Sequence, residues 1–209
     1  MLANLLTLSR LGFLIAGIWL LYAPGIAAKA MAFVLVWVVI LIDAVDGAIA
    51  RRRGEASALG SVLDIAIDRV VENVYWITFT DLQLVPVWIA LIVVTRGILT
   101  DAVRGFALAR GTTPFEMMQT NWGRLLVSHR FMRAVSGTTK VVTFAGLVAY
   151  VGLLELWQQT ANARFLPPIY TVLLVFAIVT ALVNVLHGLP VLLEARRFFA
   201  QPDLIRGRY

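Results

Sequence analysis

Six long runs of apolar residues, separated by short polar segments, make up most of this chain. The boundaries of the runs are good to a few residues, and the runs cover residues 8–27, 30–50, 59–80, 84–109, 134–157 and 166–193. A helix needs about 20 residues to cross the hydrocarbon core of a bilayer. The pattern therefore predicts an all-α, polytopic integral membrane protein with six transmembrane helices.

The composition supports the same class of protein. Sixty per cent of the residues are hydrophobic and 14% are charged, whereas soluble domains have about 45–50% apolar and about 25% charged residues. Six spans and their loops fill the 209 residues, so we expect a single membrane domain over residues 1–209. The chain has no cysteine, which excludes disulfides, thiolate catalysis and the usual zinc and iron–sulfur sites.

The basic residues indicate the orientation in the membrane. In a six-span topology most of them fall on one side, including residues 51–53 and 196–197, whereas Lys29 and Arg164 fall on the other. The positive-inside rule then places both termini in the cytoplasm. The net charge of +6 is explained by this topology and by contact with anionic membrane lipids. We expect no nucleic-acid partner, because the chain has neither a basic recognition helix nor an RNA-binding signature.

Four aspartates interrupt the second and third apolar runs. Asp43 and Asp46 are spaced i, i+3, and Asp64 and Asp68 are spaced i, i+4, so each pair occupies one face of its helix. A short polar turn joins the two runs, which predicts antiparallel helices whose acidic faces can meet near the cytoplasmic side. An ionised aspartate inside a membrane costs roughly 2.5–3.5 kcal/mol on insertion scales. This cost indicates that cations neutralise the cluster.

The types of ligand favour a hard divalent cation. Carboxylate oxygens without neighbouring Cys or His suit Mg²⁺ or Mn²⁺, and a pair of such ions would stabilise a diphosphate leaving group. A small residue such as Gly47 would let a nucleotide approach the backbone closely. Two other interpretations stay open: the acids could pair with Arg69 or Arg96, or the chain could be a divalent-cation transporter, although such sites lie near the midplane at broken helices. We expect Glu72 to pair with Arg69.

The acidic segment resembles a known signature. Every fixed position of the signature of the CDP-alcohol phosphotransferase family is matched by Asp43-x2-Asp46-Gly47-x2-Ala50-Arg51-x8-Gly60-x3-Asp64-x3-Asp68. Residues 4–10 also resemble the short N-terminal cytoplasmic helix that precedes the first span in this family. The resemblance implies a membrane enzyme of phospholipid biosynthesis, which transfers a substituted phosphate group from a CDP-linked lipid to an alcohol and releases CMP.

The resemblance also implies roles for individual residues. The metal ligands, for two ions of Mg²⁺ or Mn²⁺, would be Asp43, Asp46, Asp64 and Asp68. Asp68 would in addition be the base that deprotonates the acceptor hydroxyl. The residues that hold the cytidine diphosphate part of CDP-diacylglycerol would be Thr7, Gly47, Ala50, Arg51 and Gly60. A homodimer is a further implication.

The acceptor is less well specified by the sequence. Residues 95–111 are similar to the fourth span of bacterial phosphatidylglycerophosphate synthases, except that Gly97 replaces the usual glutamate, and Lys140 lies in a partial match to the start of their fifth span. The resemblance therefore favours glycerol 3-phosphate, with Arg110 and Lys140 holding its phosphate, and a prokaryotic-type inner or plasma membrane with a cytoplasmic active site. Inositol phosphate, another polar alcohol and phosphatidylglycerol, the acceptor of a cardiolipin-type synthase, stay open.

Overall fold

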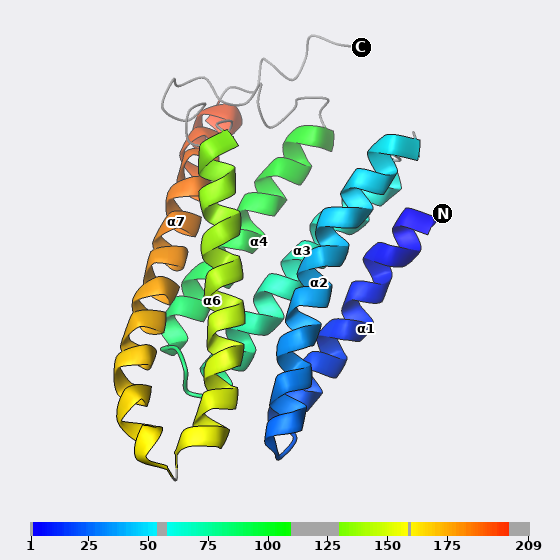
Figure 1. Ribbon diagram of the computed structural model, residues 1–209. Coiled ribbons are helices and arrows are strands. Elements are labelled where there is room, and N and C mark those ends of the chain that lie inside the picture. The colour runs from blue at the N-terminus through cyan, green and yellow to red at the C-terminus, as the bar shows by residue number, and fades with distance from the viewer. Residues whose placement is uncertain (1, 54–57, 110–129, 159, 201–209) are drawn as a thin grey trace. The chain divides into compact units, whose positions relative to one another are not determined.

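The computed structural model describes residues 2–53, 58–109, 130–158 and 160–200, and nearly all of these residues are helical (Figure 1). The helices are α1 (Leu2–Tyr22), α2 (Ile26–Arg53), α3 (Ala58–Asp81), α4 (Val87–Ala109), α6 (Arg130–Trp157), the short 3-10 helix η1 (Ala161–Phe165) and α7 (Leu166–Ala200). No strand occurs among the described residues. The predicted all-α class with six long helices is confirmed.

Four segments are apolar and long enough to cross a membrane: Leu5–Tyr22, Ile26–Asp43, Ala134–Trp157 and Ala161–Ala195. The other two long helices, α3 and α4, have 24 and 23 residues, which at 1.5 Å per residue gives about 35 Å, enough for a hydrocarbon core of about 30 Å. Charged side chains interrupt their apolar sequence, such as Asp64 and Asp68 on α3 and Arg96 on α4. The chain is an integral membrane protein.

Three boundaries differ from the predicted runs. Helix α1 ends at Tyr22 and not near residue 27, because the chain turns at Pro24 and Gly25. Residues 4–10, expected to form a short helix leading into the first span, are the first turns of α1 and continue into it without a break. Helix α7 continues through Pro190 to Ala200, beyond the predicted end at residue 193.

The chain forms two compact units. Unit 1 comprises Met1–Pro86 and Val141–Phe176, and unit 2 comprises Val87–Lys140 and Ala177–Tyr209. Helices α6 and α7 therefore contribute residues to both units. In unit 1, helix α1 packs against α2 and α3.

The turn between α1 and α2 is fixed by side-chain contacts. Gly25 has a φ of 93°, a conformation that glycine adopts without steric cost, and its N–H donates to Glu155 Oε1 at 3.1 Å. The buried Lys29 Nζ donates to the carbonyl oxygens of Leu21 and Ala23, so it caps the C-terminus of α1. The turn holds α1 antiparallel to α2, which determines what α1 can place beside the acidic face of α2.

An aromatic cluster anchors α3 within unit 1. The ring of Phe144 on α6 lies 5.1 Å from that of Tyr75, 5.4 Å from that of Trp76 and 5.7 Å from that of Phe79, between centroids. Trp76 and Phe79 are fully buried, and aromatic pairs at such separations add about 0.5–1.5 kcal/mol to the burial of their surface. Trp76 follows Asp68 by eight residues, so this aromatic packing lies about 12 Å along α3 from the acidic residues.

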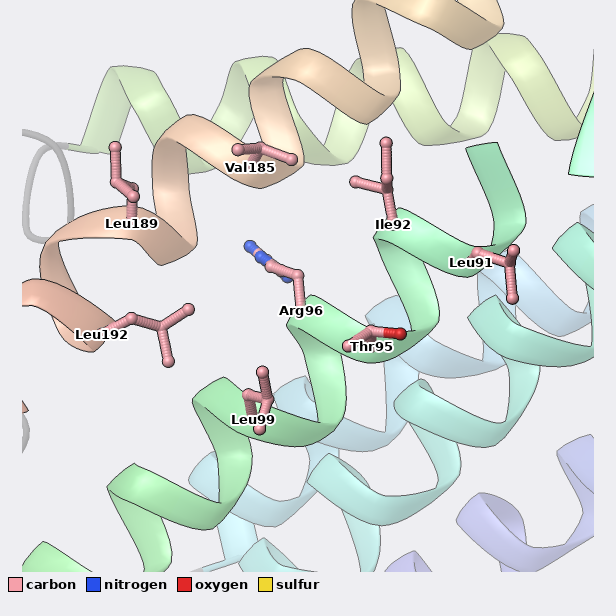
Figure 2. Close-up of a pocket in the computed structure, with 8 residues that line it drawn as sticks. All are labelled: Leu91, Ile92, Thr95, Arg96, Leu99, Val185, Leu189 and Leu192. Carbon is pink, nitrogen blue, oxygen red and sulfur yellow. The ribbon is translucent and has the colours of Figure 1, made fainter. Parts of the chain in front are cut away.

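In unit 2, α4 and α7 line a cavity of about 430 Å³ (Figure 2). Its lining is mostly aliphatic, and Arg96 is the one charged residue among the side chains that line it. In Figure 2 the Arg96 side chain points from α4 toward α7. A Cβ atom added at Gly188 of α7 would lie 3.1 Å from both Cδ and Cζ of Arg96 and closer still to its Nε. Glycine at position 188 therefore leaves the room in which Arg96 packs.

Candidate active site

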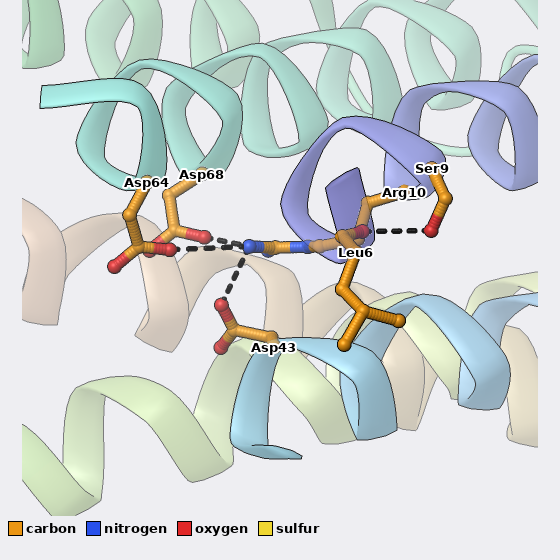
Figure 3. A network of polar contacts seen from close by, with 6 residues as sticks. All are labelled: Leu6, Ser9, Arg10, Asp43, Asp64 and Asp68. Atoms are coloured by element: carbon orange, nitrogen blue, oxygen red, sulfur yellow. Dashed lines mark hydrogen bonds and ion pairs between the residues drawn. The ribbon is translucent and has the colours of Figure 1, made fainter. Parts of the chain in front are cut away.

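Three of the four predicted acidic residues come together in unit 1. Asp43 lies on α2, and Asp64 and Asp68 lie one turn apart on α3, with one carboxylate oxygen of each within 4.8 Å of the others (Figure 3). Their side chains are 43%, 47% and 51% exposed, respectively. Two ligands on opposite sides of Mg²⁺ are about 4 Å apart, twice the metal–oxygen distance of about 2.1 Å. The separation and the oxygen-only donors fit a hard divalent cation.

A buried arginine of α1 lies among these carboxylates. Arg10 Nη1 is 2.7 Å from Asp43 Oδ1 and 3.4 Å from Asp64 Oδ1, and its Nη2 is 2.5 Å from Asp68 Oδ1. Figure 3 shows the guanidinium between Asp43 on one side and the two aspartates of α3 on the other. The Arg10 side chain is 4% exposed, so its guanidinium reaches the carboxylates from the protein interior.

Sequence reasoning missed this role of Arg10. The sequence placed Arg10 only at the end of the expected N-terminal helix, residues 4–10, and the partners considered for the acids were Arg69 and Arg96. A usable signal was present, because Arg10 is the first basic residue of the chain and lies inside an apolar run. A charge in such a position indicates a partner within the bundle.

The charges of the cluster do not balance. When all are ionised, these three carboxylates and one guanidinium carry −3 and +1, which sum to −2. Two like charges 4 Å apart repel by about 4 kcal/mol at an effective dielectric constant of 20. One divalent cation would neutralise the remaining charge.

Two other predicted residues, Thr7 and Gly60, lie one helical turn from residues of this cluster, on α1 and α3. Thr7 is one turn before Arg10 on α1 and is 5% exposed. Gly60 is one turn before Asp64 on α3. Residues three or four apart share a face of a helix, so Thr7 lies on the face of α1 that carries Arg10, and Gly60 lies on the acidic face of α3.

The remaining predicted residues are placed only by their helices or not at all. The last turns of α2 contain Asp46, Gly47, Ala50 and Arg51, whose side chains lie outside the described part of the structure. Lys140 lies on α6, in unit 2. Arg110 lies outside the described residues.

Glu72, one turn beyond Asp68 on α3, pairs with Arg69. Arg69 Nη1 is 2.9 Å from Glu72 Oε2, and the Glu72 side chain is 6% exposed. The expected pairing of Glu72 with Arg69 is confirmed.

Comparison with known proteins identifies the family. The sequence profile of CDP-alcohol phosphatidyltransferases matches residues 1–199. The chain belongs to the CDP-alcohol phosphatidyltransferase family. It is therefore an enzyme whose family substrates are a CDP-alcohol and an acceptor alcohol, as the signature between Asp43 and Asp68 predicts. Membership of this family favours an enzyme over a cation transporter.

Individual relatives within the family differ in the product that their names state. A probable phosphatidylglycerophosphate synthase of Mycobacterium tuberculosis is 30% identical over 151 residues, which are 69% of this chain and 68% of that protein. A CMP-forming cardiolipin synthase of Streptomyces coelicolor is 27% identical over 114 residues, 53% of each chain. An archaetidylinositol phosphate synthase of Aeropyrum pernix is 40% identical over 60 residues, 29% of this chain and 28% of that one. The three names state three different products.

Proposed function

We propose that this phosphatidyltransferase transfers the phosphatidyl group of CDP-diacylglycerol to a hydroxyl of glycerol 3-phosphate and releases CMP. The observation that carries the proposal is the meeting of Asp43, Asp64 and Asp68, all signature positions, at one half-exposed place. Among the relatives described above, the phosphatidylglycerophosphate synthase covers the largest share of the chain, which supports glycerol 3-phosphate as the acceptor.

The metal would be held by the acidic cluster. Asp43, Asp64 and Asp68, joined by Asp46 one turn further along α2, would bind two ions of Mg²⁺ or Mn²⁺. Bound ions would offset the negative charge of the diphosphate and of the departing CMP. EDTA should therefore abolish CMP release, and either ion should restore it; full activity in metal-free buffer would refute this part of the proposal.

Asp68 would be the general base. Its Oδ1 accepts from Arg10 Nη2, so its second carboxylate oxygen is the atom that would take the proton of the acceptor hydroxyl. As this proton leaves, the hydroxyl oxygen forms a bond to the phosphorus of the phosphatidyl group, and the bond from this phosphorus to the oxygen of CMP breaks. The side chain is half-exposed, which supports access for a polar acceptor.

The donor would bind along the faces that carry the cluster. Small residues at Gly47, Ala50 and Gly60 would let the nucleotide approach the helix backbones, and Arg51 would make a charge-assisted contact with a phosphate. Thr7, on the face of α1 that carries Arg10, would contribute a hydroxyl to the same ligand.

The acceptor phosphate would be held by basic residues, for which Arg110 and Lys140 are the candidates. A phosphorylated acceptor brings about two negative charges to a site that already receives a diphosphate, so cations beyond the metal are needed. We further propose that residues 1–209 act as one membrane domain, that both termini and the site face the cytoplasm of a prokaryotic-type membrane, and that the enzyme forms a homodimer.

The direct test supplies the purified enzyme with CDP-diacylglycerol, Mg²⁺ and a panel of acceptors, and it measures CMP and identifies the lipid product by mass spectrometry. We expect glycerol 3-phosphate to give phosphatidylglycerophosphate at the highest kcat/KM. Preference for inositol phosphate or phosphatidylglycerol would replace the acceptor and leave the donor in place. Absence of CMP with every acceptor would contradict the proposed donor.

A further inference from the structure

We propose that Arg10 is a resident counter-ion of the active site, which positions Asp43, Asp64 and Asp68 in the metal-free enzyme and competes with the divalent cation for them. This inference rests on the metal site of the proposed function. It adds a positioning residue outside the acidic signature and a specific relation between that residue and the metal.

The first support is the reach of the guanidinium. Arg10 belongs to α1 and contacts one carboxylate of α2 and two of α3, so one side chain joins three helices. A guanidinium presents several N–H donors in a rigid plane and can serve more than one carboxylate at once. Arg10 thus holds together three anions that would otherwise repel one another.

The second support is the direction from which the guanidinium arrives. The Arg10 side chain is 4% exposed, whereas the three carboxylates are 43–51% exposed. An ion from solution would therefore meet the carboxylates on their open side, with Arg10 behind them. Each contact of Arg10 uses the Oδ1 atom of an aspartate, so an ion must either take these oxygens from Arg10 or bind close to its positive charge. Both arrangements weaken metal binding.

A simple structural role for Arg10 makes different predictions. A residue that only fastens α1 to the other helices would stabilise the protein equally with and without metal, and its removal would leave metal affinity unchanged or lower. A resident counter-ion is needed most when the metal is absent. Its removal should destabilise the metal-free protein and strengthen metal binding, because the two cations compete for one set of anions.

The experiment uses the full-length protein in nanodiscs, without lipid substrate or acceptor. Mn²⁺ affinity is measured from the electron paramagnetic resonance signal of free Mn²⁺, and thermal unfolding is followed in EDTA and in saturating Mn²⁺. The variants are Arg10→Gln and Arg10→Lys. Lys29→Gln is the matched control, because Lys29 is also a buried cation of unit 1 with contacts between α1 and α2, but it precedes Asp43 by 14 residues, or about 21 Å along α2.

We expect Arg10→Gln to bind Mn²⁺ at least about fivefold more tightly than the wild type, the lower end of typical coupling between two ligands. In EDTA this variant should unfold at a lower temperature than the wild type, and Mn²⁺ should recover most of the difference. Arg10→Lys, which keeps the charge but loses the planar fork, should shift both quantities less and in the same direction. Lys29→Gln should unfold earlier in both buffers with unchanged Mn²⁺ affinity.

Unchanged or weaker Mn²⁺ binding by Arg10→Gln, with a loss of stability that Mn²⁺ does not reduce, would overturn the inference. If Arg10→Gln folds only when Mn²⁺ is present, the inference is supported. If it folds under neither condition, Arg10→Lys decides: tighter Mn²⁺ binding than the wild type supports the inference, and equal binding overturns it.

This experiment tests the role of Arg10 independently of the proposed reaction, because the assay contains no substrate. A wild type that binds no Mn²⁺ beside an Arg10→Gln variant that does would support the inference. Absence of Mn²⁺ binding in both proteins would overturn it. The CMP-release assay, with and without EDTA, then shows independently whether the phosphatidyltransferase reaction and its need for metal stand.

Discussion

Two buried or partly buried arginines, Arg10 in unit 1 and Arg96 in unit 2, have different neighbours, and these neighbours indicate different roles. Arg10 in unit 1 is buried among three carboxylates, whereas Arg96 in unit 2 lines a mostly aliphatic cavity and packs where Gly188 leaves space. Both lie in long apolar helices and incur a similar cost of insertion. The anions around Arg10 point to chemistry, whereas the feature described for Arg96 is the space that Gly188 leaves for its side chain.

The largest effect should come from the anions that distinguish the two sites. Asp64→Asn removes one charged ligand from the cluster, and we expect CMP release to fall by about 10³-fold, because a metal ion contributes several kcal/mol of charge stabilisation. Asp81→Asn is the control on the same helix, since Asp81 accepts a hydrogen bond from Tyr22 at 2.5 Å and lies 13 residues beyond Asp68. Equal loss in both variants would show that the charge acts through folding.

A second change tests whether Asp68, beside Arg10, acts as the general base and not only as a metal ligand. Asp68→Asn should lower kcat by about 10²-fold, as is typical when a general base is removed, while much of the affinity for CDP-diacylglycerol is retained. Binding is measured by equilibrium titration with the donor alone, and kcat by CMP release. A near-normal kcat would assign the base to another residue.

A third change asks which cation of unit 2 serves the acceptor. Lys140→Gln should raise the KM for glycerol 3-phosphate about tenfold through loss of a charge-assisted contact, with little change in the KM for the donor or in kcat. Arg96→Gln is the comparison variant and should leave the acceptor KM close to that of the wild type. The reverse result would make Arg96 a substrate-binding residue and remove the contrast between the two arginines.

The smallest effect concerns packing around Arg96. Gly188→Ala places a Cβ against the Arg96 guanidinium and should destabilise the protein by about 1–3 kcal/mol, the usual cost of overpacking, which thermal unfolding would detect. The control is Gly105→Ala on α4, where an added Cβ has no neighbour within 4 Å and helix propensity favours alanine. Combining Gly188→Ala with Arg96→Ala should recover most of the loss; no recovery would contradict the packing role.

The features predicted from sequence were those with local causes. The six apolar runs gave six long helices because hydrophobic length determines whether a segment can span a membrane. The i, i+4 spacing of Asp64 and Asp68 placed both on one face of α3, and the short connection to α2 brought Asp43 to them. Each inference required only helical periodicity and a turn.

The features that were missed depend on contacts between distant segments. Arg10 and Asp43 are 33 residues apart, and Arg96 and Gly188 are 92 residues apart. No spacing in a single sequence indicates that α1 packs so that its one arginine enters an acidic cluster on α2 and α3. The first predicted run extended to residue 27 for a simpler reason: the residues after the turn at Pro24 and Gly25 are also apolar, so hydropathy alone does not mark the end of α1 at Tyr22.

The place where the apolar part of α2 ends has a further consequence. Its membrane-compatible segment, Ile26–Asp43, finishes at an acidic residue of the cluster, while the helix continues to Arg53, about 15 Å further. The proposed lipid donor would present its head group there while its acyl chains stay among those of neighbouring lipids. Catalysis would then be a two-dimensional encounter, and its rate should follow the mole fraction of donor in the bilayer, not its concentration in the bulk suspension.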